Sequence, residues 1–168
     1  MSGRYFFALD FSLADKEKLY TLSSLIIPKF EYKFKVRKVP LNNLHLTILF
    51  VGDDLELLSR SLKIISRSYR TVPRYEFHIN CFGTFNKKSE QVVWAGGDFS
   101  TLVADFFELN PSLVPHITLF RVKTDKMLNF SNKCNLSISP TALRLFKSLL
   151  TPSGAVYETI ETLIDFKK

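Results

Sequence analysis

Two short apolar runs in this chain each place a histidine and a threonine two residues apart. The pairs are His45 with Thr47 and His116 with Thr118. In a β-strand, residues two apart point to the same face, and the residues between them point to the opposite face. Both runs are therefore predicted to be strands with one apolar face and one face that carries an imidazole and a hydroxyl.

The two runs use two of the three histidines in the chain, which favours a single site with near-twofold symmetry. Two imidazoles that face one substrate can divide the work of acid and base near neutral pH, because an unperturbed imidazole titrates at about 6.5. In the alternative interpretation, these residues are ordinary polar groups on the wetter face of a half-buried strand. The third histidine, His78, has no threonine two residues away and is expected to be structural.

The length of 168 residues and the hydrophobic content of 46% indicate a well-packed chain, residues 1–168, that forms one domain or two closely packed lobes. The net charge of +7 favours a polyanionic partner, and nucleic acid is the first candidate. No apolar stretch is long enough to span a membrane, and Asp10 interrupts the first apolar run too early for a signal peptide. We expect a soluble, cytoplasmic monomer without a membrane partner.

Several other kinds of site lack support in the sequence. Cys81 and Cys134 are far apart and fit no metal or redox spacing, so no disulfide is expected. Three histidines without clustered cysteines or carboxylates match no usual zinc-ligand spacing. No GxSxG turn occurs that would indicate a Ser-His-Asp hydrolase. The sequence therefore predicts a site without a metal or another cofactor.

The hydrophobic pattern predicts an α+β fold in which antiparallel sheets carry helices on their outer faces and leave a groove between the two histidine strands. Ser12 and Asp15 resemble a capping box that begins the first helix, and Pro28 ends that helix. The segment 142–150 also fits a short helix, although its neighbours favour a strand. Further helices are expected from Leu55 towards Arg70 and over 100–109. Strands are expected over 4–10, 30–38, 44–51, 75–85, 91–97, 115–120, 135–139, 142–150 and 155–166.

These residues resemble the 2H phosphoesterase superfamily, and within it most closely the RNA 2′,3′-cyclic phosphodiesterases once described as 2′-5′ RNA ligases. The resemblance extends from Arg4 to Tyr157. It implies two pseudo-symmetric lobes of antiparallel β-sheet, with helices on the outer faces and a central groove. The segments that carry it are RYFFALD, NLHLTILFVGD, FGTFNKK with QVVWAGG, VPHITLFRVK and LFKSLLTPSGAVY.

The resemblance implies hydrolysis of a 2′,3′-cyclic phosphate end of RNA to a 2′-phosphomonoester, without a metal. His45 is first expected to be the general acid and His116 the general base, but the near symmetry leaves the reverse assignment open. Thr47 and Thr118 are expected to donate hydrogen bonds to the nonbridging oxygens, unless they only pack in their strands. Reverse 2′-5′ ligation also stays open.

Arg121 matches a phosphate-binding position of the family, but strict alternation places it on the strand face opposite His116. A twist or bulge is needed to bring Arg121 to the substrate; otherwise its side chain is merely solvated. Tyr157 follows the turn at Gly154 and is expected either to line the groove or to be a structural aromatic residue. Close relatives are expected to have a small residue at the position of Phe120, so Phe120 is expected either to narrow the groove or to alter which base or leaving group fits.

Two other functions compete with this interpretation. One is a phosphodiesterase for 2′-5′ linked oligonucleotides or for small cyclic phosphates. The other is an RNA-binding protein that keeps the groove and has lost turnover. Binding alone does not require an imidazole on both walls, so the sequence favours an enzyme, but it does not identify the physiological substrate.

Overall fold

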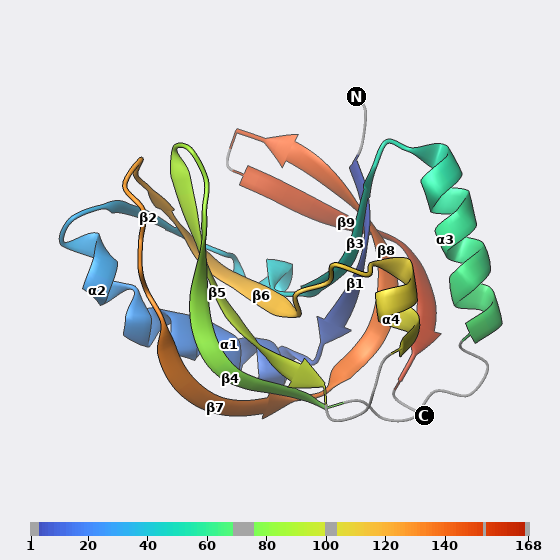
Figure 1. Cartoon of the computed structure of the whole chain (residues 1–168), viewed down its shortest axis with the longest axis horizontal. Coiled ribbons are helices and arrows are strands. Elements are labelled where there is room, and N and C mark those ends of the chain that lie inside the picture. The colour runs from blue at the N-terminus through green and yellow to red at the C-terminus, as the bar shows by residue number, and fades with distance from the viewer. Residues whose placement is uncertain (1–3, 69–75, 100–103, 153, 167–168) are drawn as a thin grey trace.

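A nine-stranded antiparallel sheet forms the framework of the protein (Figure 1). The computed structural model describes residues 4–68, 76–99, 104–152 and 154–166. The strands are β1 (Arg4–Phe11), β2 (Lys35–Lys38), β3 (Leu46–Gly52), β4 (Phe77–Asn86), β5 (Glu90–Phe99), β6 (His116–Lys123), β7 (Asn132–Ile138), β8 (Pro140–Thr151) and β9 (Gly154–Asp165). The helices are α1 (Leu13–Ile26), α2 (Pro28–Glu31), the 3₁₀-turn η1 (Leu41–Asn43), α3 (Leu55–Ser68) and α4 (Ala104–Leu109).

The strand order β7-β4-β5-β6-β3-β1-β8-β9 divides the sheet into two halves of four strands, and β2 also pairs with β6. The halves meet where β3 lies beside β6 at the residue pair Leu46 and Ile117. Helix α1 lies against β6 of one half, whereas α3 and α4 lie against β3 of the other, so helices cover both halves of the curved sheet (Figure 1). The expected α+β fold, with two pseudo-symmetric lobes and outer helices, is confirmed.

The first helix begins as its sequence predicts. The hydroxyl of Ser12 accepts a hydrogen bond from the Asp15 backbone N–H at 3.1 Å, which satisfies one of the unpaired donors at the helix start. The helix ends at Ile26, and Pro28 then occupies the first turn of α2, where its missing N–H costs nothing. None of the described helices is long and apolar enough to cross a membrane.

The predicted strand over 30–38 is wrong in its first half. Residues 28–31 form α2, and only Lys35–Lys38 form strand β2. The helical turn buries Phe30, whose ring packs edge-to-face on Phe120 and Phe130. Burying this aromatic side chain outweighs the local alternation that favoured a strand.

Two other predictions near the C-terminal half have different outcomes. Segment 142–150 lies within β8, a strand that pairs with β1 on one side and β9 on the other, so the helix alternative is wrong. The helix expected over 100–109 is described from Ala104 to Leu109, and residues 100–103 lie outside the described part of the chain.

We expect Gly97→Ala to destabilise the protein by about 1–3 kcal/mol, because a Cβ there would lie only 1.7 Å from the His78 carbonyl oxygen and force β4 from β5. Urea denaturation followed by circular dichroism measures the free energy of unfolding. Asp98→Ala, at the exposed neighbouring position, is the control and should change stability far less. Equal stability of Gly97→Ala and the wild type would contradict the close strand approach.

Candidate active site

The two histidine strands meet at a local twofold axis. Leu46 pairs with Ile117 across the antiparallel contact between β3 and β6, and both side chains are fully buried on the core side. Because the strands run in opposite directions, the residues flanking this pair also face one another across it. The register therefore sets His45 across from Thr118, and Thr47 across from His116, on the face opposite the core.

Each histidine strand contains a β-bulge at the residue after its threonine. Between β1 and β3 the register shifts at Ile48, and between β5 and β6 it shifts at Leu119. An extra residue in one strand reverses the alternation beyond it. The reversal brings Phe50 and Arg121, each five residues after a histidine, to the groove side, where both line the same groove.

The bulge also settles where Phe120 lies. Its side chain is fully buried in the core against Phe30, on the side of the sheet away from the groove. The expectation that Phe120 narrows the groove is therefore wrong, because the same shift in alternation that exposes Arg121 turns its neighbour inward.

Both imidazoles are oriented by a backbone carbonyl two residues earlier. The Nδ1–H of His45 donates to the Asn43 carbonyl at 2.7 Å, and the Nδ1–H of His116 donates to the Val114 carbonyl at 2.7 Å. A carbonyl only accepts, so in the neutral rings Nδ1 holds the proton and Nε2 is an acceptor. In His45, Nε2 lies 3.1 Å from Oγ1 of Thr47, whose hydroxyl donates to it.

Burial disfavours the charged form of both histidines. It lowers the pKa of His45 to about 4, although the hydrogen bond to the Asn43 carbonyl and the charge of Asp10 act in the opposite direction. The charges of Lys16 and His116 lower the His45 pKa further, which shows that the two imidazoles lie within electrostatic range of each other. Burial also lowers the pKa of His116.

Aromatic rings surround the imidazole of His45. Phe6 and Tyr157 lie with their ring centroids 5.1 Å from it, and the Tyr157 ring is perpendicular to the imidazole. Burial raises the pKa of the Tyr157 phenol. Tyr157 therefore both packs against His45 and lines the groove, so the two interpretations of this residue are compatible.

Aromatic rings also surround His116. Phe85 packs edge-to-face against the imidazole with centroids 4.8 Å apart, and Trp94 lies 6.0 Å away. The Trp94 indole lies over two glycines, because a Cβ at Gly83 or Gly96 would come within 2.2 Å or 2.5 Å of the ring. The glycines of the central hairpin thus make room for the ring that packs on His116.

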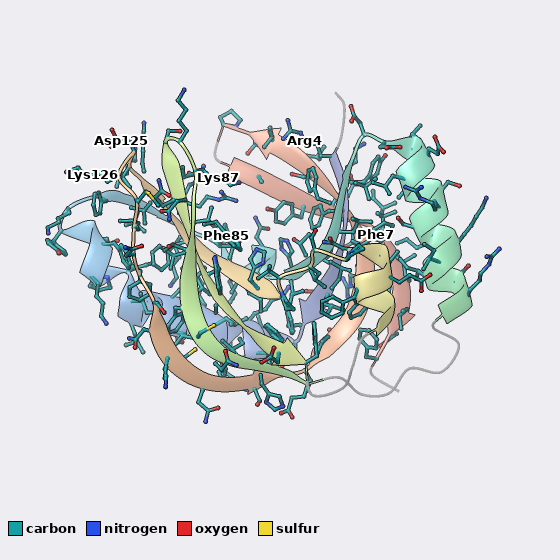
Figure 2. All side chains as sticks on the ribbon, in the orientation of Figure 1. Arg4, Phe7, Phe85, Lys87, Asp125 and Lys126 are labelled. Carbon is teal, nitrogen blue, oxygen red and sulfur yellow. The ribbon has the colours of Figure 1, made fainter. Side chains whose placement is uncertain are left out.

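A groove of about 740 Å³ runs along this face of the sheet. Five of the six predicted site residues line it, namely His45, Thr47, Thr118, Arg121 and Tyr157. The sixth, His116, lies at the same level of the sheet, across from Thr47. Figure 2 shows Lys87 at the tip of the β4–β5 hairpin and Arg4 at the start of β1, so both halves contribute cations to the groove.

The sequence analysis did not identify a second arginine beside Arg121. Arg37 on β2 pairs directly with Arg121 on β6, and both line the groove. Glu90 holds both, with Oε1 3.0 Å from Arg37 and Oε2 3.0 Å from Arg121. The basic residues that alternate with apolar ones up to residue 38 predicted a charged strand face, but they did not indicate which strand β2 would pair with.

The remaining histidine lies elsewhere in the fold. His78 on β4 is exposed, its Nδ1 lies 2.8 Å from the Ser137 hydroxyl, and it does not line the groove. Within the described ranges, no group of three or more His, Cys, Asp or Glu side chains is placed to hold a metal ion.

The chain is similar to curated proteins of one name over most of its length. No family model matches the sequence. A curated protein of Methanocaldococcus jannaschii named RNA 2′,3′-cyclic phosphodiesterase is 29% identical over 94% of this chain and 98% of its own length. One of the same name from Thermotoga maritima is 27% identical, covering 94% of this chain and 92% of its own.

Solved structures share the fold. A protein of Thermus thermophilus matches with a TM-score of 0.70 and 24% identity, over 94% of this chain and 95% of that protein. Escherichia coli LigT in complex with 3′-AMP matches with a TM-score of 0.70 and 22% identity, over 96% of each chain. This chain thus shares the curled antiparallel sheet with few helices of these solved structures. By sequence, it resembles the curated RNA 2′,3′-cyclic phosphodiesterases over nearly its whole length.

We expect His45 in the free protein to titrate with a pKa of about 4, with its proton on Nδ1 at neutral pH. Two-dimensional ¹H–¹⁵N spectra of the imidazoles, recorded against pH, report the tautomer and the midpoint. The folded protein binds this proton more weakly than the unfolded chain, so the His45 contribution to stability is lost as the pH falls from about 6.5 towards 4. A His45 midpoint at the ordinary value would contradict its burial.

Proposed function

We propose that this protein hydrolyses 2′,3′-cyclic phosphate ends of RNA to 2′-phosphomonoesters, using two histidines and no metal. The observation that carries this proposal is the twofold arrangement at Leu46 and Ile117, which sets two oriented imidazoles on one face of the sheet, His45 in the groove and His116 beside it at the same level. The curated relatives named RNA 2′,3′-cyclic phosphodiesterase support the same reaction class.

The reaction requires proton transfer on both sides of the phosphorus. A water molecule attacks phosphorus and gives a proton to one imidazole, while the bond from phosphorus to O3′ breaks and O3′ receives a proton from the other imidazole. The product keeps its ester bond to O2′. Each Nδ1–H is held by a backbone carbonyl, so each Nε2 is the atom that exchanges the proton.

The pKa values favour His45 as the base, the reverse of the first expectation from the sequence. A general base must be neutral before the reaction, and the low pKa of His45 keeps its Nε2 unprotonated near neutral pH. The general acid must hold a proton, and since burial lowers the pKa of His116 as well, this role requires the bound anionic phosphate to raise it. The proposed roles are thus His45 as base and His116 as acid.

The other groove residues bind the phosphate. Thr47 and Thr118 lie across from the two histidines and donate their hydroxyl hydrogens to the nonbridging oxygens of the bound substrate as negative charge develops there. Thr47 then gives up its hydrogen bond to His45 Nε2, which becomes available for proton transfer. The Arg121 guanidinium supplies further donors and a positive charge, and Tyr157 supports the His45 ring. One chain supplies every residue in this arrangement, so we propose that a monomer is sufficient.

We expect the purified protein to convert adenosine 2′,3′-cyclic phosphate to adenosine 2′-phosphate in excess chelator. His45→Ala and His116→Ala should each lower kcat by about a hundredfold to ten-thousandfold, because each removes one proton transfer. Chromatographic separation of the 2′- and 3′-phosphates identifies the product.

His78→Ala is the matched control, since it removes the exposed histidine outside the groove, and it should keep wild-type turnover. Tight RNA binding without product would instead favour a binding protein. Faster cleavage of 2′-5′ linked oligonucleotides than of cyclic ends would favour the rival substrate.

We expect the acid and base to be distinguished by a substrate whose leaving group needs no proton, 3′-deoxyadenosine 2′-(p-nitrophenyl phosphate). His116→Ala should lose much less activity on it than on the cyclic phosphate, whereas His45→Ala should lose as much on both. Release of p-nitrophenolate is followed by absorbance. If His45→Ala were the variant rescued, His45 would be the acid and the assignment would be reversed.

A further inference from the structure

The groove departs from its local twofold symmetry at the residues after the bulges. Phe50 and Arg121 occupy equivalent positions, five residues after His45 and His116, and both line the groove. Phe50 is 56% exposed, so an apolar ring stands at one end where a guanidinium stands at the other. A substrate in this groove therefore has a defined direction, with its negative charge towards Arg121.

The cationic end contains more positive charge than one phosphate requires. Arg37 and Arg121 are directly opposite one another in the β2–β6 pair, a placement in which like charges repel. Glu90 compensates only one of them and does not line the groove. Lys87 adds a third cation from the β4–β5 turn, and no acidic side chain is among the described residues that line the groove.

Glu90 fixes the direction of the two arginines. Each of its carboxylate oxygens holds one guanidinium at 3.0 Å, so the remaining N–H donors of Arg37 and Arg121 are free to face the groove. Against the larger effect of burial, the charges of both arginines lower the pKa of the Tyr157 phenol of the other half, and all three side chains line the groove. By contrast, the Lys38 ammonium lies over the Tyr20 ring of α1.

Arg37 and Arg121 reach the groove from different strands, so Arg37 does not duplicate Arg121. Ile117, at the level of the histidines, and Arg121 are four residue steps apart on β6, at most about 13 Å of strand. Arg37 lies across from Arg121 on β2, and β2 pairs with the same edge of β6 as β3, because β5 pairs with the other edge. Arg121 thus shares its strand with His116, whereas Arg37 reaches a bound substrate from the edge of β6 that faces the other half of the sheet.

We propose that Arg37, held by Glu90 beside Arg121, forms a second phosphate site that takes the phosphate on O5′ of the nucleotide that carries the cyclic phosphate. This proposal rests on the proposed function. In RNA that group is the internucleotide diester, and in a mononucleotide it is a monoester, so the shared chemistry is a phosphate ester on O5′. The site makes the enzyme selective for ends that carry such a phosphate.

The test compares adenosine 2′,3′-cyclic phosphate with two substrates that add a phosphate on O5′. One is its 5′-monophosphate, and the other is the dinucleotide ApA with a terminal 2′,3′-cyclic phosphate. The wild type should show kcat/KM about tenfold or more higher on the substrates with the added phosphate, because a hydrogen bond to a charged group is strong. Arg37→Gln should reduce that preference to about one.

Lys35→Gln is the matched control, because it removes one cation from the same strand at a residue that does not line the groove, and it should keep the preference. A higher kcat/KM on the 5′-monophosphate, on the dinucleotide or on both supports the site if Arg37→Gln abolishes the gain and Lys35→Gln does not. The substrate that shows the gain identifies which phosphate ester the site accepts. Equal kcat/KM on all three substrates, or an equal loss in Arg37→Gln with and without the O5′ phosphate, overturns it.

Failure of the proposed function gives a different result, in which the wild type releases no product from any of the three substrates. The second phosphate site is then tested by measuring the equilibrium dissociation constants of adenosine 2′-phosphate and adenosine 2′,5′-bisphosphate. About tenfold tighter binding of the bisphosphate, lost in Arg37→Gln, supports the second phosphate site. Equal affinities overturn it.

Discussion

The contact between Leu46 and Ile117 is the constraint on which the rest of the site depends. It joins the two halves of the sheet at a single residue pair, and it lies on the local twofold axis. Both side chains are fully buried, so sliding one strand by a residue would turn this pair out of the core. The same burial that stabilises the junction therefore fixes which face the two histidines occupy.

The bulges convert this symmetric junction into a directional groove. Without them, Phe50 and Arg121 would face the core side, where an arginine would need a buried partner. The extra residues Ile48 and Leu119 are fully buried, so each adds an aliphatic side chain to the core, and the residue two positions later, Phe50 or Arg121, lines the groove. Strand irregularity thus contributes to packing and to the site at once.

Much of the site followed from local sequence pattern, and particular failures show where that pattern ends. Short-range chemistry and the two-residue period of a strand were enough to predict three features of the structure. These are the Ser12 cap, the strands of both histidines and the groove position of Thr47. The 30–38 strand was wrong because Phe30 reaches the core from a helical turn. Arg121 could not be placed, because a bulge changes alternation without an obvious signal in the sequence.

The sequence by itself determined that each histidine shares a strand face with a threonine, because that relation depends only on the period of the β-strand. Only the tertiary structure decided what stands across from them. The Arg37, Glu90 and Arg121 bridge joins three strands, and the rings around His45 come from β1 and β9. Such neighbours are set by strand order and register, which the packing of the whole core selects.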